Sequence, residues 1–276
     1  MFNLKQIYKK REPWVHKGQF GKLLVIAGSN QYSGSPIFNT MAALRAGVDL
    51  AYILTPERVS NIISSFAPEM ITIPYKGDFL TRRQIPLILK TLKEKRTTAL
   101  LMGGGLGREA ETFLAIREII KKIDLPMVLD ADAIRALENH WQILKDKKVV
   151  LTPHADEFKQ LTGDKVEANF EDRKAKVKKW AKKIGAPILL KGHIDFASDG
   201  EEIYLNRGGS VYMTKGGFGD TLAGICGALV ARGVDIFEAL CAACYINNRA
   251  GGMACEKFGE GIIASDIFEY IPKVIS

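Results

Sequence analysis

The chain has 276 residues, of which 47% are hydrophobic, and a formal net charge of +8. This length and composition suit one large α/β domain whose core needs no disulfide bonds. The N-terminal residues lack the apolar run of a signal peptide, and no segment reaches the roughly 20 apolar residues that span a bilayer. We therefore expect a single domain over residues 1–276 in a cytoplasmic protein with no membrane contact.

The four cysteines do not predict a metal site. Cys241 and Cys244 form a C-x-x-C pair, but no second pair or histidine cluster follows it, so zinc is not expected. We expect all four to be reduced thiols packed among small apolar residues near the C-terminus. They are Cys226, Cys241, Cys244 and Cys255.

The positive charge is most concentrated in residues 173–183, RKAKVKKWAKK. Val177 and Trp180 lie three apart in this run, which indicates a helix with one buried stripe and lysines around it. A solvated helix face is therefore predicted, and nucleic acid is not expected as a partner. The positive field would still speed the association of substrates that carry several phosphates.

In chain order, the pattern alternates strand and helix. Residues 22–28, KLLVIAG, are a continuous apolar run that leads into a loop, as in a buried parallel strand. Residues 35–47 have helical spacing and end at a glycine. Further strands are predicted, with helices between most of them, at residues 49–55, 69–75, 98–103, 125–132 and 149–154. Such alternation predicts a largely parallel sheet with helices on both faces.

The pattern changes after Ile188. Residues 188–214 predict several short β segments, with tight turns at Asp199-Gly200 and Gly208-Gly209. A long helical region is then predicted from about residue 216 nearly to the C-terminus.

In open parallel sheets, ligands bind beyond the carboxyl ends of the strands. The most informative loop there is residues 215–221, KGGFGDT, in which three glycines precede a long apolar helix. The first amides of such a helix can bind a phosphate. Asp220 in the same turn is interpreted as the base that removes a proton from a hydroxyl. The alternative is that Asp220 only caps the helix.

Two other loops contain candidate residues. Residues 103–109, GGGLGRE, match neither the P-loop nor the dinucleotide fingerprint, and a tight turn with packing glycines is the alternative. Residues 151–158, LTPHADEF, place His154 and Glu157 three apart after a buried strand. This pair alone does not suffice for zinc, whereas Mg²⁺ near Glu157 is compatible with the few carboxylates that this ion needs.

These loops in this order resemble the ribokinase-like superfamily and, more closely, the ADP- or ATP-dependent NAD(P)H-hydrate dehydratases. The branch-specific motifs are HKGxxG, LTPHxxEF and ASDIxxxIP, within residues 16–29, 149–158 and 261–272. The resemblance covers almost the whole chain. It implies a ribokinase-like three-layer α/β/α fold with a largely parallel central sheet, and a homo-oligomer.

By this resemblance, the protein repairs hydrated NADH or NADPH with ADP or ATP as phosphoryl donor and Mg²⁺ as cofactor. The 6-hydroxyl of the hydrate would be phosphorylated, and phosphate would then be eliminated. The matching positions make Asp220 the catalytic base and Glu157 a ligand of Mg²⁺ through water. The nucleotide residues would be Lys191, Gly192, His193, Ile194, Asp195, Gly217 and Gly219. The hydrated dinucleotide would contact Gly34, Ser35, Gly105, Gly107, His154 and Asp220.

The chain departs from the family pattern at four places. TPHADE replaces TPHPGE before Glu157, and GGFGD replaces GGTGD, so Phe218 puts an aromatic residue beside the phosphate loop. INNRAGG, residues 246–252, replaces a His-Gly…Ala-Gly-Asp pattern, which puts contacts from this helix in doubt. The roughly 20 residues before the first strand are too few for a domain of the usual size, so an epimerase is expected on a separate chain or not at all.

Two other functions remain open from the sequence. A ribokinase-like kinase of a hydroxymethylpyrimidine, thiazole or sugar alcohol would share Asp220 and the glycine loop, although HKGQFG and the His154 loop argue against it. A nucleotide-binding regulator without activity would explain the altered INNRAGG segment, although Asp220 and both glycine loops argue against it.

Overall fold

The computed structural model describes residues 2–276. Its centre is one nine-stranded sheet with the order β3-β2-β1-β4-β5-β6-β7-β8-β9. The strands from β3 to β7 are parallel, and β8 and β9 continue the sheet in antiparallel fashion. Their bounds are β1 Lys22–Ile26, β2 Leu50–Pro56, β3 Ile71–Tyr75, β4 Ala99–Met102, β5 Met127–Leu129, β6 Val149–Leu151, β7 Ile188–Leu190, β8 Asp195–Ser198 and β9 Ile203–Asn206.

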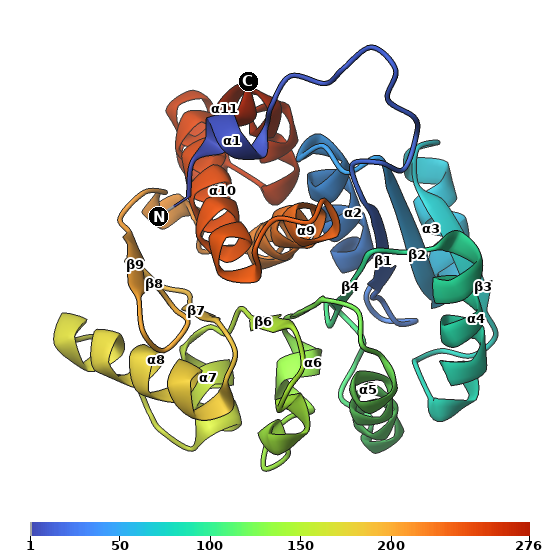
Figure 1. Cartoon of the computed structure of the whole chain (residues 1–276), viewed down its shortest axis with the longest axis horizontal. Helices are drawn as coiled ribbons and strands as arrows, with labels where there is room; N and C mark the ends of the chain where they lie inside the picture. Colours follow the sequence, from blue (N-terminus) through green and yellow to red (C-terminus); the bar gives the residue numbers. More distant parts are fainter. Residues whose placement is uncertain (1) are drawn as a thin grey trace.

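Helices cover both faces of the sheet, as the α/β/α prediction requires (Figure 1). One face carries α2 Gly34–Arg45, α3 Glu57–Phe66, α9 Phe218–Ala231 and α10 Ile236–Phe258. The other carries α4 Ile85–Lys95, α5 Ala110–Lys122, α6 Asp132–Arg135, α7 Ala155–Thr162 and α8 Phe170–Ile184. The short helices α1 Leu4–Ile7 and α11 Ile271–Ile275 lie near α10.

The strands are buried on both faces because successive side chains point in opposite directions. Leu23 and Val25 of β1 join the core under α2 and α9, whereas Leu24 and Ile26 join the core on the α5 side. A continuous apolar run in the sequence therefore reflects two cores separated by one sheet.

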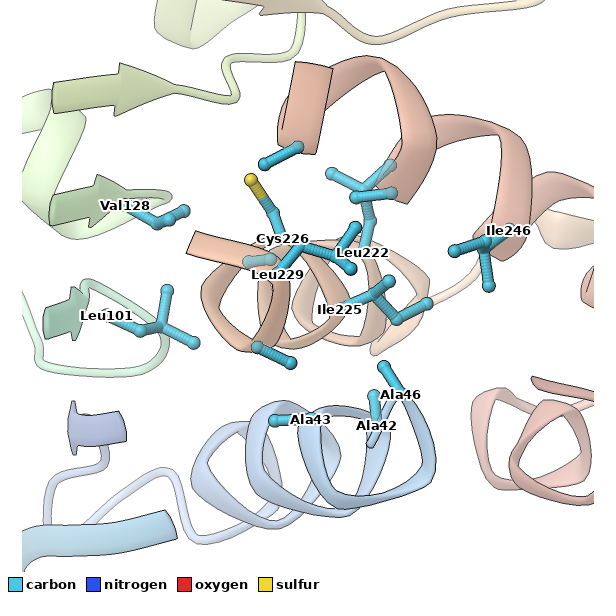
Figure 2. Close-up of a cluster of buried hydrophobic side chains, with 14 of the residues drawn as sticks. Ala42, Ala43, Ala46, Leu101, Val128, Leu222, Ile225, Cys226, Leu229 and Ile246 are labelled. Atoms are coloured by element: carbon cyan, nitrogen blue, oxygen red, sulfur yellow. The ribbon is translucent and has the colours of Figure 1, made fainter. Parts of the chain in front are cut away.

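Helix α9 lies between the sheet, α2 and α10, and nearly all of its residues are buried. Figure 2 shows Ile225 of α9 facing Ala42 and Ala46 of α2, whereas Leu222 and Leu229 of the same core cluster lie on the side of α9 away from α2. A Cβ on Gly224 would meet the backbone carbonyl of Asn39, so the glycine permits this close packing. The packing fixes the N-terminal end of α9, where Asp220 lies.

Most of the predicted elements are present, and the differences are local. Val211–Met213 forms a 3₁₀ helix (η3) rather than a β segment, so Gly208-Gly209 is not a hairpin turn, whereas residues 199–202 do connect two antiparallel strands. The predicted strand at 125–132 is shorter, because Asp130 lies beyond β5 and α6 begins at Asp132. The C-terminal helical region is divided between α9 and α10.

The basic run lies in α8, and Val177 and Trp180 are buried there as predicted. All four cysteines, which belong to the described part of the chain, are free thiols, and three of them are buried. None of the helices within residues 2–276 has the length and apolar character needed to cross a membrane.

Candidate functional site

The carboxyl ends of five neighbouring strands bring most of the predicted residues into one row. Because the strand order is β1-β4-β5-β6-β7, the segments that follow them contribute, in turn, Ser35, the glycines 103–107, Asp130, His154 and Lys191. The N-terminal end of α9 faces this row with Asp220. The parallel topology thus places the candidate site where ligands bind in open sheets.

Asp220 is the third residue of α9, and its side chain does not cap the helix. Gly217, with φ +98°, is the N-cap residue. The carboxylate instead accepts a hydrogen bond from Ser35 Oγ, with 3.2 Å between Oγ and Oδ2. Burial and the nearby charge of Asp130 raise the pKa of Asp220 to about 7, against the opposing effects of Ser35 and Lys191. A carboxyl group with this pKa can exchange a proton near neutral pH.

The glycines after β4 allow the backbone to approach Asp220 and Asp130. A Cβ on Gly104 would lie 2.5 Å from Asp220 Oδ1, and a Cβ on Gly103 would collide with the carbonyl of Asp130. Gly105 has φ +63° and lies against Ser35 and Tyr32. These glycines are therefore required by packing, and the same packing brings them to Asp220.

Two aspartates after β5 belong to the site, although no role was predicted for them from the sequence. Asp130 is 3% exposed, and its Oδ1 accepts from Thr152 Oγ1 at 2.7 Å. Asp132 Oδ2 accepts from the amide of Gly107 at 3.0 Å. Ala131 between them has φ +47°, a conformation that is costly for a residue with a side chain and recurs at functional sites. The DAD sequence at the end of a predicted strand was the signal that could have identified them.

Lys191 is the cationic centre of the site. Its Nζ lies 2.9 Å from Asp130 Oδ1, and the side chain is 20% exposed. Burial opposes its charge, but Asp130, Glu157 and Asp220 outweigh that effect and raise its pKa. A Cβ on Gly219 would lie 3.2 Å from Lys191 Nζ, so the ammonium group is next to the glycine loop that begins α9.

His154 and Glu157 form the cap of α7. His154 Nδ1 accepts from the amides of Asp156 and Glu157, and Glu157 Oε2 accepts from the amide of His154 at 3.0 Å. Because Nδ1 accepts, Nε2 carries the proton and lies 3.1 Å from Glu157 Oε1. Burial would raise the pKa of Glu157, but the hydrogen bond from His154 and the charge of Lys191 lower it overall. Glu157 is therefore ionised at neutral pH.

A cavity of about 590 Å³ adjoins these residues. Its wall includes six residues predicted from the sequence, namely His154, Lys191, Gly192, His193, Asp195 and Gly219. Ile194 and Gly217 belong to the same loops but lie outside the wall, as do Gly34, Ser35, Gly105, Gly107 and Asp220. A second cavity, of about 610 Å³, lies between α6 and α7 and contains none of the predicted residues.

The segment INNRAGG does reach the cavity. Asn248 Nδ2 donates to Asp195 Oδ2 at 2.7 Å, and Asn247 Oδ1 accepts from Thr221 Oγ1 at 2.8 Å. Both asparagines line the cavity. Burial raises the pKa of Asp195, against the opposing effect of the hydrogen bonds from the Gly192 amide and Asn248. Phe218, the other departure, is 5% exposed and packs into the core, although it also forms part of the wall.

Among residues 2–276, no group of three or more His, Cys, Asp or Glu side chains is placed to hold a metal ion. The ionised Glu157 already accepts hydrogen bonds from His154 through both oxygens. This arrangement fits a magnesium ion that is bound mainly by water and by phosphate oxygens of a ligand, and it does not fit a cage built by the protein.

Comparisons with known proteins point to one family. A family model described as NAD(P)H-hydrate dehydratase matches residues 23–273. The chain is 41% identical over 261 residues to the bifunctional NAD(P)H-hydrate repair enzyme of Pyrobaculum aerophilum, which covers 94% of this chain and 51% of that protein. It is 36% identical to the ADP-dependent (S)-NAD(P)H-hydrate dehydratase of Cenarchaeum symbiosum, over 94% of this chain and 90% of that protein.

A solved structure agrees with these sequence matches. The ADP/ATP-dependent NAD(P)H-hydrate dehydratase of Bacillus subtilis, co-crystallised with ATP and Mg²⁺, superposes with a TM-score of 0.81 at 25% identity, over 99% of this chain and 96% of that one. The chain spans about half the length of the first curated relatives that it matches.

Proposed function

The chain belongs to the NAD(P)H-hydrate dehydratase family, and we propose that it restores NADH or NADPH from the hydrated form with ADP or ATP as phosphoryl donor. The observation that carries the proposal is that Asp220 adjoins two differently lined regions. Gly219, which precedes it, lines the cavity together with Lys191, whereas Ser35, to which it is hydrogen-bonded, lies with Gly105 outside the cavity wall. A base between two ligand sites is the arrangement that phosphoryl transfer requires.

In the first step, the nucleotide phosphates lie at the N-terminal end of α9, where free helix amides and Lys191 stabilise their negative charge. Asp220 takes the proton of the 6-hydroxyl while the hydroxyl oxygen bonds to the terminal phosphorus and the bond from that phosphorus to the nucleotide breaks. Magnesium, bound through water near Glu157, would supply further charge neutralisation of the phosphates.

In the second step, the bond between C6 and the phosphorylated oxygen breaks and phosphate leaves. C5 gives its proton to the departing phosphate, and the electron pair of the C5–H bond forms the C5=C6 double bond. Phosphorylation serves to convert a poor leaving group into a good one. The protein's contribution to this step is to keep the intermediate beside Asp220 and away from bulk water.

The test follows both products. The purified protein is incubated with chemically prepared hydrate and with ADP or ATP, and recovery of reduced-nicotinamide absorbance is measured together with free phosphate. The proposal expects both signals in equal amounts, whereas the kinase alternative expects a phosphorylated acceptor without recovered absorbance. The Asp220→Asn variant should turn over ~10²–10⁴-fold more slowly than the wild type while still binding nucleotide. Retention of more than a tenth of the activity would remove Asp220 as the base.

The homo-oligomer and the separate epimerase chain stay predictions. Light scattering of the purified protein tests the first. An assay with the (R) and (S) hydrates separately tests whether this chain needs an epimerase to use both.

A further inference from the structure

A buried amide lies directly beneath Asp220. Asn39, on α2, is 1% exposed. Its Nδ2 donates to the backbone carbonyl of Asp220, at 2.8 Å. Its Oδ1 is buried and has no hydrogen-bond partner among residues 2–276. A buried acceptor without a donor is costly, and in native proteins it calls for an explanation.

The orientation of this amide is fixed by chemistry. A backbone carbonyl can only accept, so the NH₂ group of Asn39 must face Asp220 O, and Oδ1 must face the other way. On that side lies Gly104, and a Cβ placed there would be 3.0 Å from Asn39 Oδ1 and 2.5 Å from Asp220 Oδ1. Both oxygens therefore border the same small space. Two acceptors in one buried space repel each other unless one of them carries a proton.

We propose that Asn39 is a positioning residue that holds the start of α9 through Nδ2 and accepts, through Oδ1, the hydrogen bond of the neutral Asp220 carboxyl. When Asp220 takes the proton of the substrate hydroxyl, the O–H bond of the substrate breaks and that of the carboxyl forms. Asn39 then stabilises the neutral product of this transfer. The role deepens the proposed function, because it rests on Asp220 as the base.

The charged and polar groups around Asp220 come from three segments. Asp130 and Asp132, after β5, raise the pKa of Asp220, whereas Lys191, after β7, and Ser35, on α2, lower it. Burial raises it most. Asn39 adds a short-range effect in the same direction as burial, since a hydrogen bond to the neutral form disfavours the ionised form.

The experiment measures the Asp220 carboxyl directly, by ¹³C NMR titration of protein labelled at the aspartate carboxyl carbon without any substrate. The signal is assigned by its loss in Asp220→Asn. We expect a midpoint of about 7 in the wild type and a decrease of about one pH unit in Asn39→Leu, which is the worth of one hydrogen bond. Thr40→Val is the matched control, because Thr40 is the next residue of α2, is fully buried and also has an unpartnered oxygen among residues 2–276.

Three results would overturn the proposal. They are a wild-type midpoint near 4, an unchanged midpoint in Asn39→Leu, and an equal decrease in Thr40→Val. Asn39→Ala, whose side chain cannot clash, is measured in parallel and replaces the leucine variant if that variant does not fold. Because no turnover is required, a protein that failed the dehydratase assay could still confirm the Asn39–Asp220 interaction, and an active one could still contradict it.

Discussion

Gly104 has no room for a side chain, because a Cβ there would lie 2.5 Å from Oδ1 of Asp220. Gly104→Ala should therefore displace the Asp220 carboxylate and lower kcat by at least tenfold, with little effect on nucleotide affinity. Gly252→Ala is the control, since a Cβ on Gly252 meets nothing within 4 Å. The measurement is kcat by absorbance recovery, with nucleotide affinity by calorimetry. An alanine variant as active as the wild type would mean that the carboxylate can move aside without loss.

The raised pKa of Asp220 has a consequence for stability. The folded state holds this carboxyl protonated up to a pH of about 7, whereas the unfolded chain releases the proton near pH 4. The free energy of unfolding therefore decreases as the pH rises from about 4 to about 7. Above that range, the folded protein carries the full penalty of an ionised carboxylate at a buried position. Asp220→Asn removes the penalty, so it should be more stable than the wild type by on the order of a few kcal/mol at pH 8 and by almost nothing at pH 4.

Urea unfolding at the two pH values checks this expectation. Asp124→Asn is the control, because that carboxylate is 92% exposed and pairs with Lys147 at the surface. A stability difference between Asp220→Asn and wild type that does not change with pH would argue against a buried carboxyl with a raised pKa.

Lys191 should shift the pKa of Asp220 in the direction opposite to the effect proposed for Asn39. Its positive charge lowers the pKa of Asp220, so Lys191→Met should move the acid limb of the kcat/KM profile to higher pH and weaken nucleotide binding. Lys182→Met removes a surface lysine that pairs with Glu201 and should leave the limb in place. If the limb moved to lower pH in Lys191→Met, the charge of Lys191 would not act on Asp220 in this way.

The sheet, its helices and the row of loops at the strand ends were predictable, because periodicity and glycine positions are local properties of the sequence. The roles of Asn39 and Asp130 were not, because each depends on a contact across the fold. Asn39 lies within an apolar helix and touches Asp220, 181 residues away. Asp130 meets Lys191 across β6, at a separation of 61 residues. Helix propensity and strand patterns give no information about contacts between residues so far apart in the chain.

The residue at which α9 begins could not be predicted from the sequence either. The three glycines left open whether Asp220 capped the helix or lay within its first turn as a base. The structure decides the matter because Gly217 takes the left-handed conformation and starts the helix before Asp220. A single residue also decides the conformation at η3. Ser210 accepts a hydrogen bond from the amide of Tyr212 and so caps a short 3₁₀ helix, although the sequence VYMT predicted a β segment.

His154 has both a structural and a proposed binding role, and two variants separate them. His154→Ala removes the cap of α7 and should cost about 1 kcal/mol of stability. His154→Asn keeps a capping acceptor and should recover that loss. Both should weaken binding of the hydrated dinucleotide and leave nucleotide affinity nearly unchanged, as measured by separate calorimetric titrations.

The position of His154 in the cavity wall makes the titration with both ligands informative. His154 lies there together with Lys191 and His193, which are assigned to the nucleotide. An equal loss of affinity for both ligands in His154→Asn would assign this histidine to the nucleotide side.

The last prediction concerns Gly219, the second residue of α9. It needs no left-handed conformation, and a Cβ there meets only Lys191 Nζ within 4 Å. The fold should therefore accept Gly219→Val at the modest cost of a β-branched residue in a helix. The branched side chain would, however, lie between Lys191 and the first amides of α9, where a phosphate must approach the backbone.

Thermal melts with and without ADP or ATP measure the effect. Saturating nucleotide should stabilise the wild type by roughly 2.7 kcal/mol at a hundred times the dissociation constant, and Gly219→Val should show no such shift. Gly252→Val is the matched control, a glycine in α10 with open space around it and the same change of side chain. It should melt with a normal nucleotide shift. A normal shift in Gly219→Val as well would place the phosphates elsewhere, and Asp220 would then lack the phosphoryl group that it is proposed to serve.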